Sequence, residues 1–271
     1  MIILKTQSEI GIMREAGLIN QACHMEIKNH IHEGVSTWEL DKIAEEFIMK
    51  QGGKPAFKGY HGYPATINAS INEEVVHGIP NRHRKLKNGD IIGIDLGTIW
   101  KGYYADSANT WAVGEISPDA DKLMRVTKEC LYLGISKCME GNRVSDISAA
   151  VQQHAESNGF SVVRDLVGHG IGRKMHEDPK VPNFVEKRRR DIDHKLKSGM
   201  VIAIEPMINM GSYSVEILED DWTVVTTDRK PSAHYEHTVA ITKDGPVILT
   251  ASEGQERFDI EEFSAIIGNK R

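Results

Sequence analysis

The chain has 271 residues, of which 40% are hydrophobic and 27% charged, as is typical of a globular protein in water. Its net charge of −6 argues against a main role in nucleic-acid binding, and DNA is not an expected partner. No apolar run approaches membrane-spanning length, the start lacks the pattern of a signal peptide, and three cysteines without CxxC spacing fit a reducing compartment. We therefore expect a cytoplasmic protein with no membrane contact and no thiolate zinc site.

Four helices are predicted along the chain. The capping boxes at Thr6–Glu9 and Ser36–Glu39 begin the first two, which extend to about His30 and to Gly52. Two further helices are expected after Ser117 to about residue 139, and over residues 145–157. Strands are predicted at Thr66–Ile71, Glu74–His77, Asp90–Leu96, Tyr103–Val113, Ser161–Val163, Met200–Ile208, Trp222–Thr226, Tyr235–Ile241 and Pro246–Leu249. No Ser/Gly/Pro-rich linker divides the chain, so we expect a single domain over residues 1–271.

The order of segments repeats. Leu86–Asp95 reads L-K-N-G-D-I-I-G-I-D and Leu196–Glu205 reads L-K-S-G-M-V-I-A-I-E. The helical segments that start at Glu33-Gly34 and Glu140-Gly141 precede these motifs at a similar offset, and so do His61-Gly62 and His169-Gly170. The pattern predicts two pseudo-equivalent α/β halves, roughly residues 1–115 and 116–271, whose acidic strand ends face each other. The alternative is two unrelated buried strands that both end in an acid.

Five positions place an acid or a histidine where a strand or tight turn would fix it: Asp95, Asp106, His169, Glu205 and Glu236. We expect Asp95 and Asp106 on adjacent antiparallel strands, with Gly97–Gly102 as the turn. Four carboxylates cannot share a dry pocket without cations or raised pKa values. Two divalent ions would resolve this, and an oxygen-rich set with one imidazole suits Mn, Fe, Co or Zn. Taken singly, each acid could instead be a capping or salt-bridged residue.

The motifs G-I-D-L-G, Y-Y-A-D-S-A, G-H-G-I-G, I-E-P and H-Y-E-H-T occur in this order and cover nearly the whole chain. Together they resemble the signature of type I methionine aminopeptidases. The resemblance implies the α+β "pita-bread" fold, with two pseudo-symmetric halves around a dinuclear metal site. It points to the compact bacterial-type form, without a zinc-finger extension or the long insertion of type II enzymes.

The resemblance also implies roles for single residues. Asp95, Asp106 and Glu236 would bind or bridge both metals, and His169 and Glu205 would complete one metal's ligands. A metal-bridging hydroxide would attack the carbonyl after the N-terminal methionine, with Glu205 as the proton shuttle. His176 would donate to the oxyanion, and His77 would contact the substrate near the scissile bond. The alternative for the last two is a satisfied structural histidine.

The same resemblance assigns Tyr60, Tyr63 and Trp222 to a pocket for the methionine thioether, which packs well on aromatic rings. Asn68 and Met175 depart from the family pattern, where many members carry a cysteine and some an aromatic residue. The implied substrate is the initiator methionine of nascent proteins before a small second residue, and the expected form is a monomer. The basic run 187–190 could touch ribosomal RNA, as could a second basic run at Arg82–Lys87; a solvated loop is the alternative.

Two other functions stay open. One is an enzyme of the same fold that resembles prolidase or aminopeptidase P and cleaves before proline. The other is a non-catalytic pita-bread protein that binds ribosomes or RNA. Proteins of the latter kind typically lack metal ligands, and none of the five positions is missing here.

Overall fold

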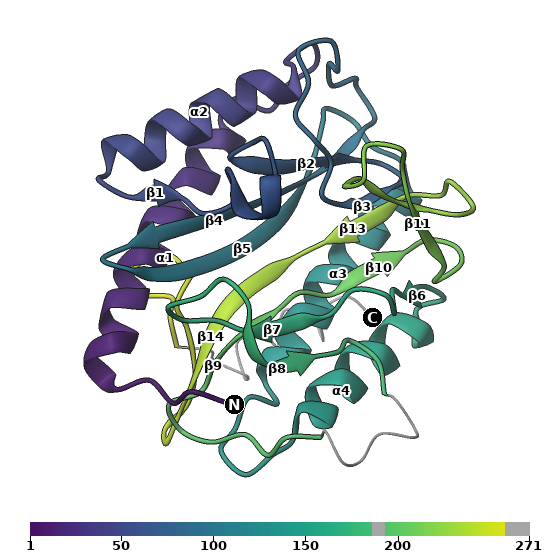
Figure 1. Ribbon diagram of the computed structural model, residues 1–271. Helices are drawn as coiled ribbons and strands as arrows, with labels where there is room; N and C mark the ends of the chain where they lie inside the picture. Colours follow the sequence, from purple (N-terminus) through teal and green to yellow (C-terminus); the bar gives the residue numbers. More distant parts are fainter. Residues whose placement is uncertain (186–192, 258–271) are drawn as a thin grey trace.

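The computed structural model of the protein describes residues 1–185 and 193–257 (Figure 1). Its helices are α1 (Gln7–Lys28), α2 (Thr37–Lys50), α3 (Pro118–Ile135) and α4 (Val144–Ser157). Both predicted capping boxes are present, with Thr6 and Ser36 accepting from the N3 amides of Glu9 and Glu39. Within the described residues, no helix is both long and apolar enough to cross a membrane.

The core of the fold is a nine-stranded sheet of order β1-β4-β5-β14-β9-β7-β8, in which β2 also pairs with β4 and β15 with β14. Its strands are β1 (Lys54–Pro55), β2 (Ile67–Ile71), β4 (Ile91–Trp100), β5 (Tyr103–Ala112), β7 (Gly168–Gly170), β8 (Glu177–Val181), β9 (Val201–Ile204), β14 (Glu236–Thr242) and β15 (Gly245–Ile248). Two three-stranded sheets, β13-β10-β6 and β11-β12-β3, flank it. Their strands are β3 (Glu74–Val76), β6 (Ser161–Val162), β10 (Met207–Asn209), β11 (Val215–Ile217), β12 (Val224–Thr226) and β13 (Ser232–His234).

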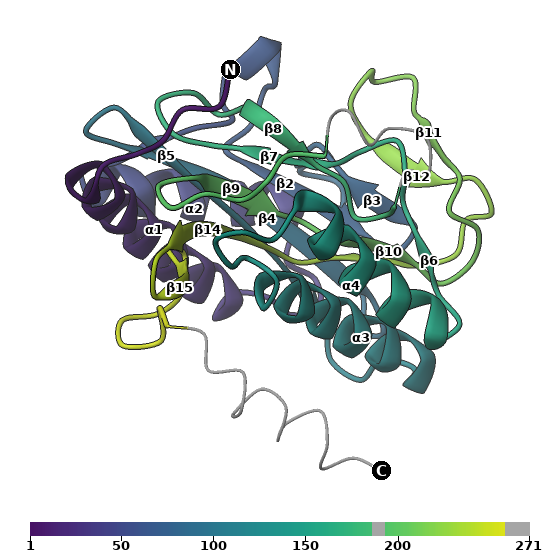
Figure 2. The ribbon, with the colours of Figure 1, turned by 90° about the horizontal axis from the view of Figure 1, so that it is seen from below.

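The helices gather on one side of the sheet, as Figure 2 shows from below. Helix α1 packs on β4 and β5, and α3 packs on β14 and β9. From α1, Asn20 and His24 reach Ser107 of β5, so Ser107 points to the helix side. Successive residues of a strand point to opposite faces, so Asp106 points to the open face. The open face is therefore where the predicted ligands of β5 meet those of other strands.

Two predicted strand boundaries are wrong. Strand β4 continues to Trp100, so the turn before β5 is the pair Lys101-Gly102, both with positive φ (47° and 80°), and not the whole segment Gly97–Gly102. The predicted strand Met200–Ile208 is two strands, β9 and β10, because Pro206 has no N–H to donate to a ladder. The break leaves Glu205 just beyond the end of β9.

The two halves of the chain make matching hydrogen bonds around the repeated motifs. Gly34 N donates to Leu86 O at 2.8 Å. Gly141 N donates to Leu196 O at 3.0 Å in the same way. Both glycines have positive φ, 88° and 100°, a conformation that favours glycine. The repeat is thus visible in local structure, while the assignment of one domain with halves 1–115 and 116–271 stays a prediction.

The histidine pair is not part of this repeat. His169 lies in β7, which pairs with β9 as β2 pairs with β4. His61 lies in a short 3₁₀ turn (Tyr60–Gly62) ahead of β2 and is exposed. The similar spacing of the two His-Gly pairs therefore does not reflect equivalent positions.

Candidate metal centre

Strand register brings three carboxylates together on the open face. Asp95 of β4 and Glu236 of β14 both lie opposite Ala108, which β5 places between them. Asp106 is two residues before Ala108 and so points to the same face. These three side chains are buried, with residue exposures of 9% for Asp95, 4% for Asp106 and 2% for Glu236.

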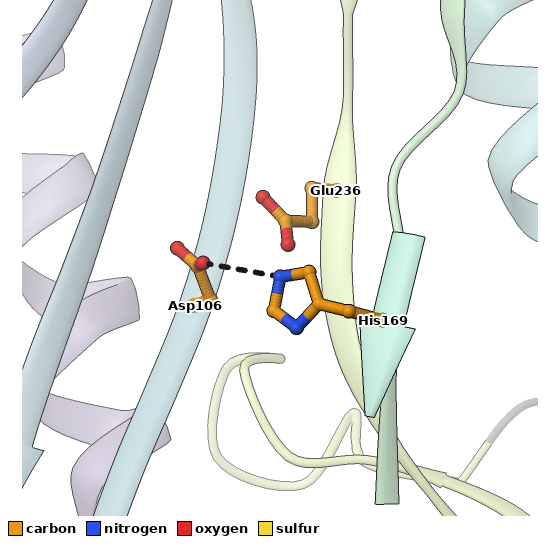
Figure 3. A group of neighbouring side chains, drawn as sticks. All are labelled: Asp106, His169 and Glu236. Carbon is orange, nitrogen blue, oxygen red and sulfur yellow. Dashed lines mark ion pairs between the residues drawn. The ribbon is translucent and has the colours of Figure 1, made fainter. Parts of the chain in front are cut away.

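His169 and Glu205 reach the same point from β7 and from the end of β9. The Nε2 atom of His169 lies 4.0 Å from Asp106 Oδ2 and 3.7 Å from Glu205 Oε1. Figure 3 shows His169, Asp106 and Glu236 pointing toward one another from three strands. One ligand atom from each of these three residues lies within 4.8 Å of the others. The arrangement is close enough for a single cation to contact all three.

Burial shapes the electrostatics of this group. It raises the pKa of Asp95 to about 7, although a hydrogen bond from Asn68 acts in the opposite direction. The pKa values of Asp106 and Glu236 are raised well above normal, first by burial and then by neighbouring carboxylates. Burial and the charge of Asp95 likewise raise the pKa of Glu205. Without a cation, the ionised carboxylates repel one another in a dry site.

The donor atoms fit a divalent metal. Asp95 Oδ1, Asp106 Oδ1 and Glu236 Oε1 are buried without a hydrogen-bond partner among the described residues. Burial lowers the pKa of His169 to about 4, so the ring is neutral at pH 7. Its Nδ1–H donates to Gly170 O at 2.8 Å, which leaves the Nε2 lone pair facing the carboxylates. This is the tautomer that a metal-binding histidine requires.

The predicted substrate residues gather beside the acids. Tyr63 and Trp222 make an edge contact with ring centroids 5.0 Å apart, and they share an apolar cluster with Tyr60 and Met175. The Tyr63 hydroxyl is not free, because it donates to Ile67 O and Gly78 O. His77 contacts Trp222 with ring centroids 6.4 Å apart. Tyr60, Tyr63, Met175 and Trp222 thus form one apolar wall. Tyr63 places this wall beside the acidic group, because the charge of Asp95 acts on its hydroxyl.

His176 links this wall to the candidate ligands. Its ring lies 4.3 Å from that of His169 between centroids. The Tyr60 hydroxyl is 2.7 Å from His176 Nδ1. Burial raises the pKa of Tyr60, so the phenol keeps its proton and donates it to Nδ1. The remaining proton of a neutral His176 is then on Nε2, where it can be donated to another group.

Sequence reasoning missed several partners of the site. Asn68 Nδ2 donates to Asp95 Oδ2 at 2.7 Å, a contact that the register of β2 and β4 creates. Asn183 Nδ2 donates to the backbone oxygen of Glu205 at 2.9 Å. Phe57 and Tyr104 belong to the apolar cluster. The family resemblance singles out Asn68 but not its bond to Asp95, and no sequence signal points to the others.

Comparison with known proteins places this site in a family. The family model described as metallopeptidase family M24 matches residues 11–243. The chain belongs to metallopeptidase family M24. Family membership and the candidate ligand group together support binding of a divalent metal.

Similar proteins agree with this assignment. The chain is 54% identical over 250 residues to "Methionine aminopeptidase" of Clostridium perfringens, covering 92% of this chain and 99% of the relative. It is equally similar to "Methionine aminopeptidase 1" of Bacillus subtilis, with the same coverage. The crystal structure of methionine aminopeptidase from Thermotoga maritima matches with a TM-score of 0.90 and 42% identity, over 93% of this chain and 100% of that one.

These findings confirm the predicted pita-bread fold and the predicted enzyme class, a peptidase. A prolidase from Pyrococcus furiosus has the same fold, with a TM-score of 0.74 and 24% identity over 66% of its length. That likeness concerns the fold alone. The roles of the individual site residues stay predictions.

Proposed function

We propose that this protein removes the N-terminal methionine from peptides and nascent proteins, using two divalent ions drawn from Mn, Fe, Co or Zn. The observation that carries the proposal is the convergence of four carboxylates and a neutral histidine on one face of the sheet, beside an aromatic wall. The relatives named methionine aminopeptidase, 54% identical over nearly their full length, support the choice of substrate.

In this proposal Asp95, Asp106 and Glu236 would hold the ions from three adjacent strands, and His169 and Glu205 would complete the ligand set. When bound, the ions supply an activated water and polarise the scissile carbonyl. Glu205 has a raised pKa and lies at the end of its strand, where its side chain is 14% exposed. It is therefore suited to take a proton from the water and pass it to the leaving amine.

The histidines act on the substrate in this proposal. His176 donates its Nε2–H to the carbonyl oxygen as negative charge develops there, since Tyr60 occupies Nδ1. Burial lowers the pKa of His77 to about 4, so at neutral pH it is an uncharged hydrogen-bonding group beside Trp222. Tyr60, Tyr63 and Trp222 form the apolar wall for the methionine side chain. We further propose a preference for a small second residue.

A cleavage specificity for proline is the second candidate, but only the fold supports it. The prolidases that resemble this chain do so at 25% identity or less, and the chain covers about two thirds of their length. The non-catalytic alternative is not favoured, because all five ligand positions are filled and brought to one face.

Peptide cleavage by the metal-loaded protein tests the proposal. We expect free methionine from Met-Ala-Ser with Mn, Fe or Co present, and no release of alanine from Ala-Pro peptides. Chelation should abolish the activity and added metal should restore it. If no methionine appears under any metal, the proposed function is wrong.

A cytoplasmic monomer that touches the ribosome remains part of the proposal. The predicted contact at residues 187–190 lies outside the described residues. In the second basic run, Arg82 stacks on Trp38 at 4.0 Å and Arg84 pairs with Glu74, while Lys85 and Lys87 are exposed. Charge reversal of Arg188, Arg189 and Arg190 should therefore weaken ribosome co-sedimentation, and unchanged binding would rule out this contact.

A further inference from the structure

A buried ion pair lies next to the candidate site and has no role in the proposal above. Lys5 Nζ contacts Glu177 Oε2 at 2.6 Å, and the two side chains are only 4% and 5% exposed. Charged side chains are seldom buried to this degree unless they are paired. Replacing such a pair with apolar residues is often neutral or stabilising, so its presence calls for a role other than stability.

Glu177 is the residue after His176 and organises the turn that carries it. Its Oε1 accepts from Lys174 N at 3.2 Å, while Gly172 N donates to Lys174 O at 3.1 Å. The backbone of Glu177 pairs with Gly170, directly beside His169. One carboxylate therefore closes the turn between the two histidines whose rings lie 4.3 Å apart.

Lys5 fixes that carboxylate from the N-terminal segment. Its backbone N–H donates to Gly199 O at 2.7 Å, and its Nζ also reaches Ile3 O at 3.1 Å. The fit is tight at Gly172, where an added Cβ would lie 2.5 Å from Lys5 Cε and 2.8 Å from Glu177 Oε1. This close packing thus restricts Lys5, Gly172 and Glu177 to a single arrangement relative to one another.

We propose that Lys5 is a positioning residue, which through its buried ion pair with Glu177 holds the turn 171–176 and so fixes the His176 ring over the metal centre. The inference rests on the proposed function for its effect on catalysis. It does not rest on that function for its effect on the turn. Catalytic groups lose rate steeply with displacement, about 100-fold for 1 Å, so a loosened turn should be visible in turnover.

The test is the double variant Lys5→Met/Glu177→Met, which removes both charges and leaves no buried ion unpaired. Amide hydrogen exchange at Lys174 should become faster by about tenfold or more because its acceptor is lost. Cleavage of Met-Ala-Ser should show a kcat lower by between tenfold and about 100-fold, with a nearly unchanged KM. Mn binding by calorimetry should stay at the wild-type affinity.

A double-mutant cycle with His176→Ala separates positioning from general damage. In the His176→Ala background, removing the ion pair should cost no further kcat, because the group that it positions is gone. The matched control is Lys101→Met/Glu15→Met, which removes a pair with the same 2.6 Å separation but side chains 54% and 49% exposed. The control should leave both exchange at Lys174 and kcat unchanged.

Two results would overturn the proposal: unchanged exchange across residues 172–176 in the double variant, or an equal loss of kcat with and without His176. If the double variant fails to fold, Lys5→Gln keeps a neutral donor to Glu177 and is measured in the same way. If the wild-type protein releases no methionine, the proposed function fails, while exchange at Lys174 in the Lys5→Gln variant, which keeps Glu177 as the acceptor, still decides whether Lys5 holds the turn.

Discussion

Glu205 differs from the other acidic residues of the centre in where it lies. Asp95, Asp106 and Glu236 sit within strands whose ladders hold them, whereas Glu205 follows β9 and precedes Pro206. Its carbonyl is held by Asn183, but its carboxylate faces His169 at 3.7 Å and makes no hydrogen bond with any residue that the structure describes. A carboxylate that is not fixed by hydrogen bonds is suited to act as the proton shuttle.

We expect Glu205→Gln to lower kcat by about 10²- to 10⁴-fold, the usual contribution of a general acid–base group, while the fold persists. Steady-state cleavage of Met-Ala-Ser and circular dichroism measure the two effects. Glu216→Gln, an exposed acid on β11, is the control and should leave kcat unchanged. Activity near that of the wild type would show that Glu205 is not the proton shuttle.

The hydrogen bond between Tyr60 and His176 sets the tautomer of the histidine, in our interpretation. Tyr60→Phe removes the donor to Nδ1 and lets the ring exchange tautomers. A net hydrogen bond of about 1 kcal/mol corresponds to roughly a fivefold loss of kcat. Nitrogen-15 NMR of His176 should show a mixed tautomer in the variant. Tyr213→Phe, at an exposed tyrosine, should change neither quantity.

At the scale of elements, the hairpin of β11 and β12 delivers Trp222 to the aromatic wall. Asp220 builds the loop: its Oδ1 accepts from Trp222 N at 2.9 Å and from Thr223 N at 2.8 Å, and its Oδ2 accepts from the Thr223 hydroxyl. Desolvation raises the pKa of Asp220, but these hydrogen bonds together outweigh it, so the pKa is lowered. The loop is thus held by the Asp220 side chain together with backbone bonds from Leu218 N to Thr223 O at 2.9 Å and from Asp221 N to Leu218 O at 3.0 Å.

Asp220→Ala should loosen Trp222 and raise KM for Met-Ala-Ser several-fold, with kcat changed little, since the wall binds ground and transition states alike. Asp228→Ala is a matched control, because Asp228 makes similar bonds to Ser212 N and Lys230 N at the other end of the same hairpin. An equal rise of KM in both variants would show that the hairpin acts as a whole and that Asp220 has no special role.

Elements with strong local signals were predictable from sequence. The helices α1 and α2 begin where their capping boxes indicate, and α3 has Pro118 in its first turn. Strand β7 was not predicted, because three residues with glycine on both sides carry no alternation. The break at Pro206 was missed because the apolar run continues on both sides of it. Local chemistry thus fixed the helices better than the short strands.

The five candidate ligands were found through motifs, while their supporting contacts were not. Lys5 and Glu177 are 172 positions apart, and Asn68 meets Asp95 only because β2 and β4 pair in one register. Such contacts depend on the whole topology and leave no mark in a single sequence. The same holds for Tyr60 and His176, 116 positions apart.

At the scale of the whole molecule, the centre stores electrostatic repulsion that metal binding should relieve. We expect Mn to raise the free energy of unfolding by about 2.7 kcal/mol at 100 times its dissociation constant, provided that it binds only the folded state. Thermal unfolding with Mn and with EDTA measures the difference. Asp106→Asn should abolish the shift, and Asp228→Asn should preserve it. A shift of equal size in both variants would place the ion elsewhere.

A buried histidine on the helix side of the sheet, His24, makes the stability of the fold depend on pH. His24 is fully buried between α1 and β5, and its Nε2 lies 3.0 Å from Ser107 O. Its Nδ1 has no hydrogen-bond partner among the described residues. Burial lowers the pKa of His24 from 6.5 to about 4. The folded protein therefore holds this ring neutral over a range of pH in which the unfolded chain protonates it.

The direction in which stability changes with pH follows from proton binding. Between pH 6.5 and about 4 the unfolded state binds more protons at His24 than the folded state, so stability falls as the pH falls. The loss is about 1.4 kcal/mol per pH unit in that window and vanishes above it. The raised pKa values of the site carboxylates act in the opposite direction in metal-free protein. A comparison with a variant at the same pH cancels their contribution.

We therefore expect His24→Gln, which keeps a donor near Ser107 O, to change the pH dependence of stability and not only its level. Urea unfolding in EDTA at several pH values between 7.5 and 4.5 gives the free energy for both proteins. Above pH 7 the two curves should run parallel. Below pH 6.5 the wild type should lose about 1.4 kcal/mol more per pH unit than the variant, because only the wild type must keep a titratable ring neutral. Curves that stay parallel down to pH 4.5 would mean that His24 is protonated in the folded protein, with water or a local opening of α1 solvating its charge.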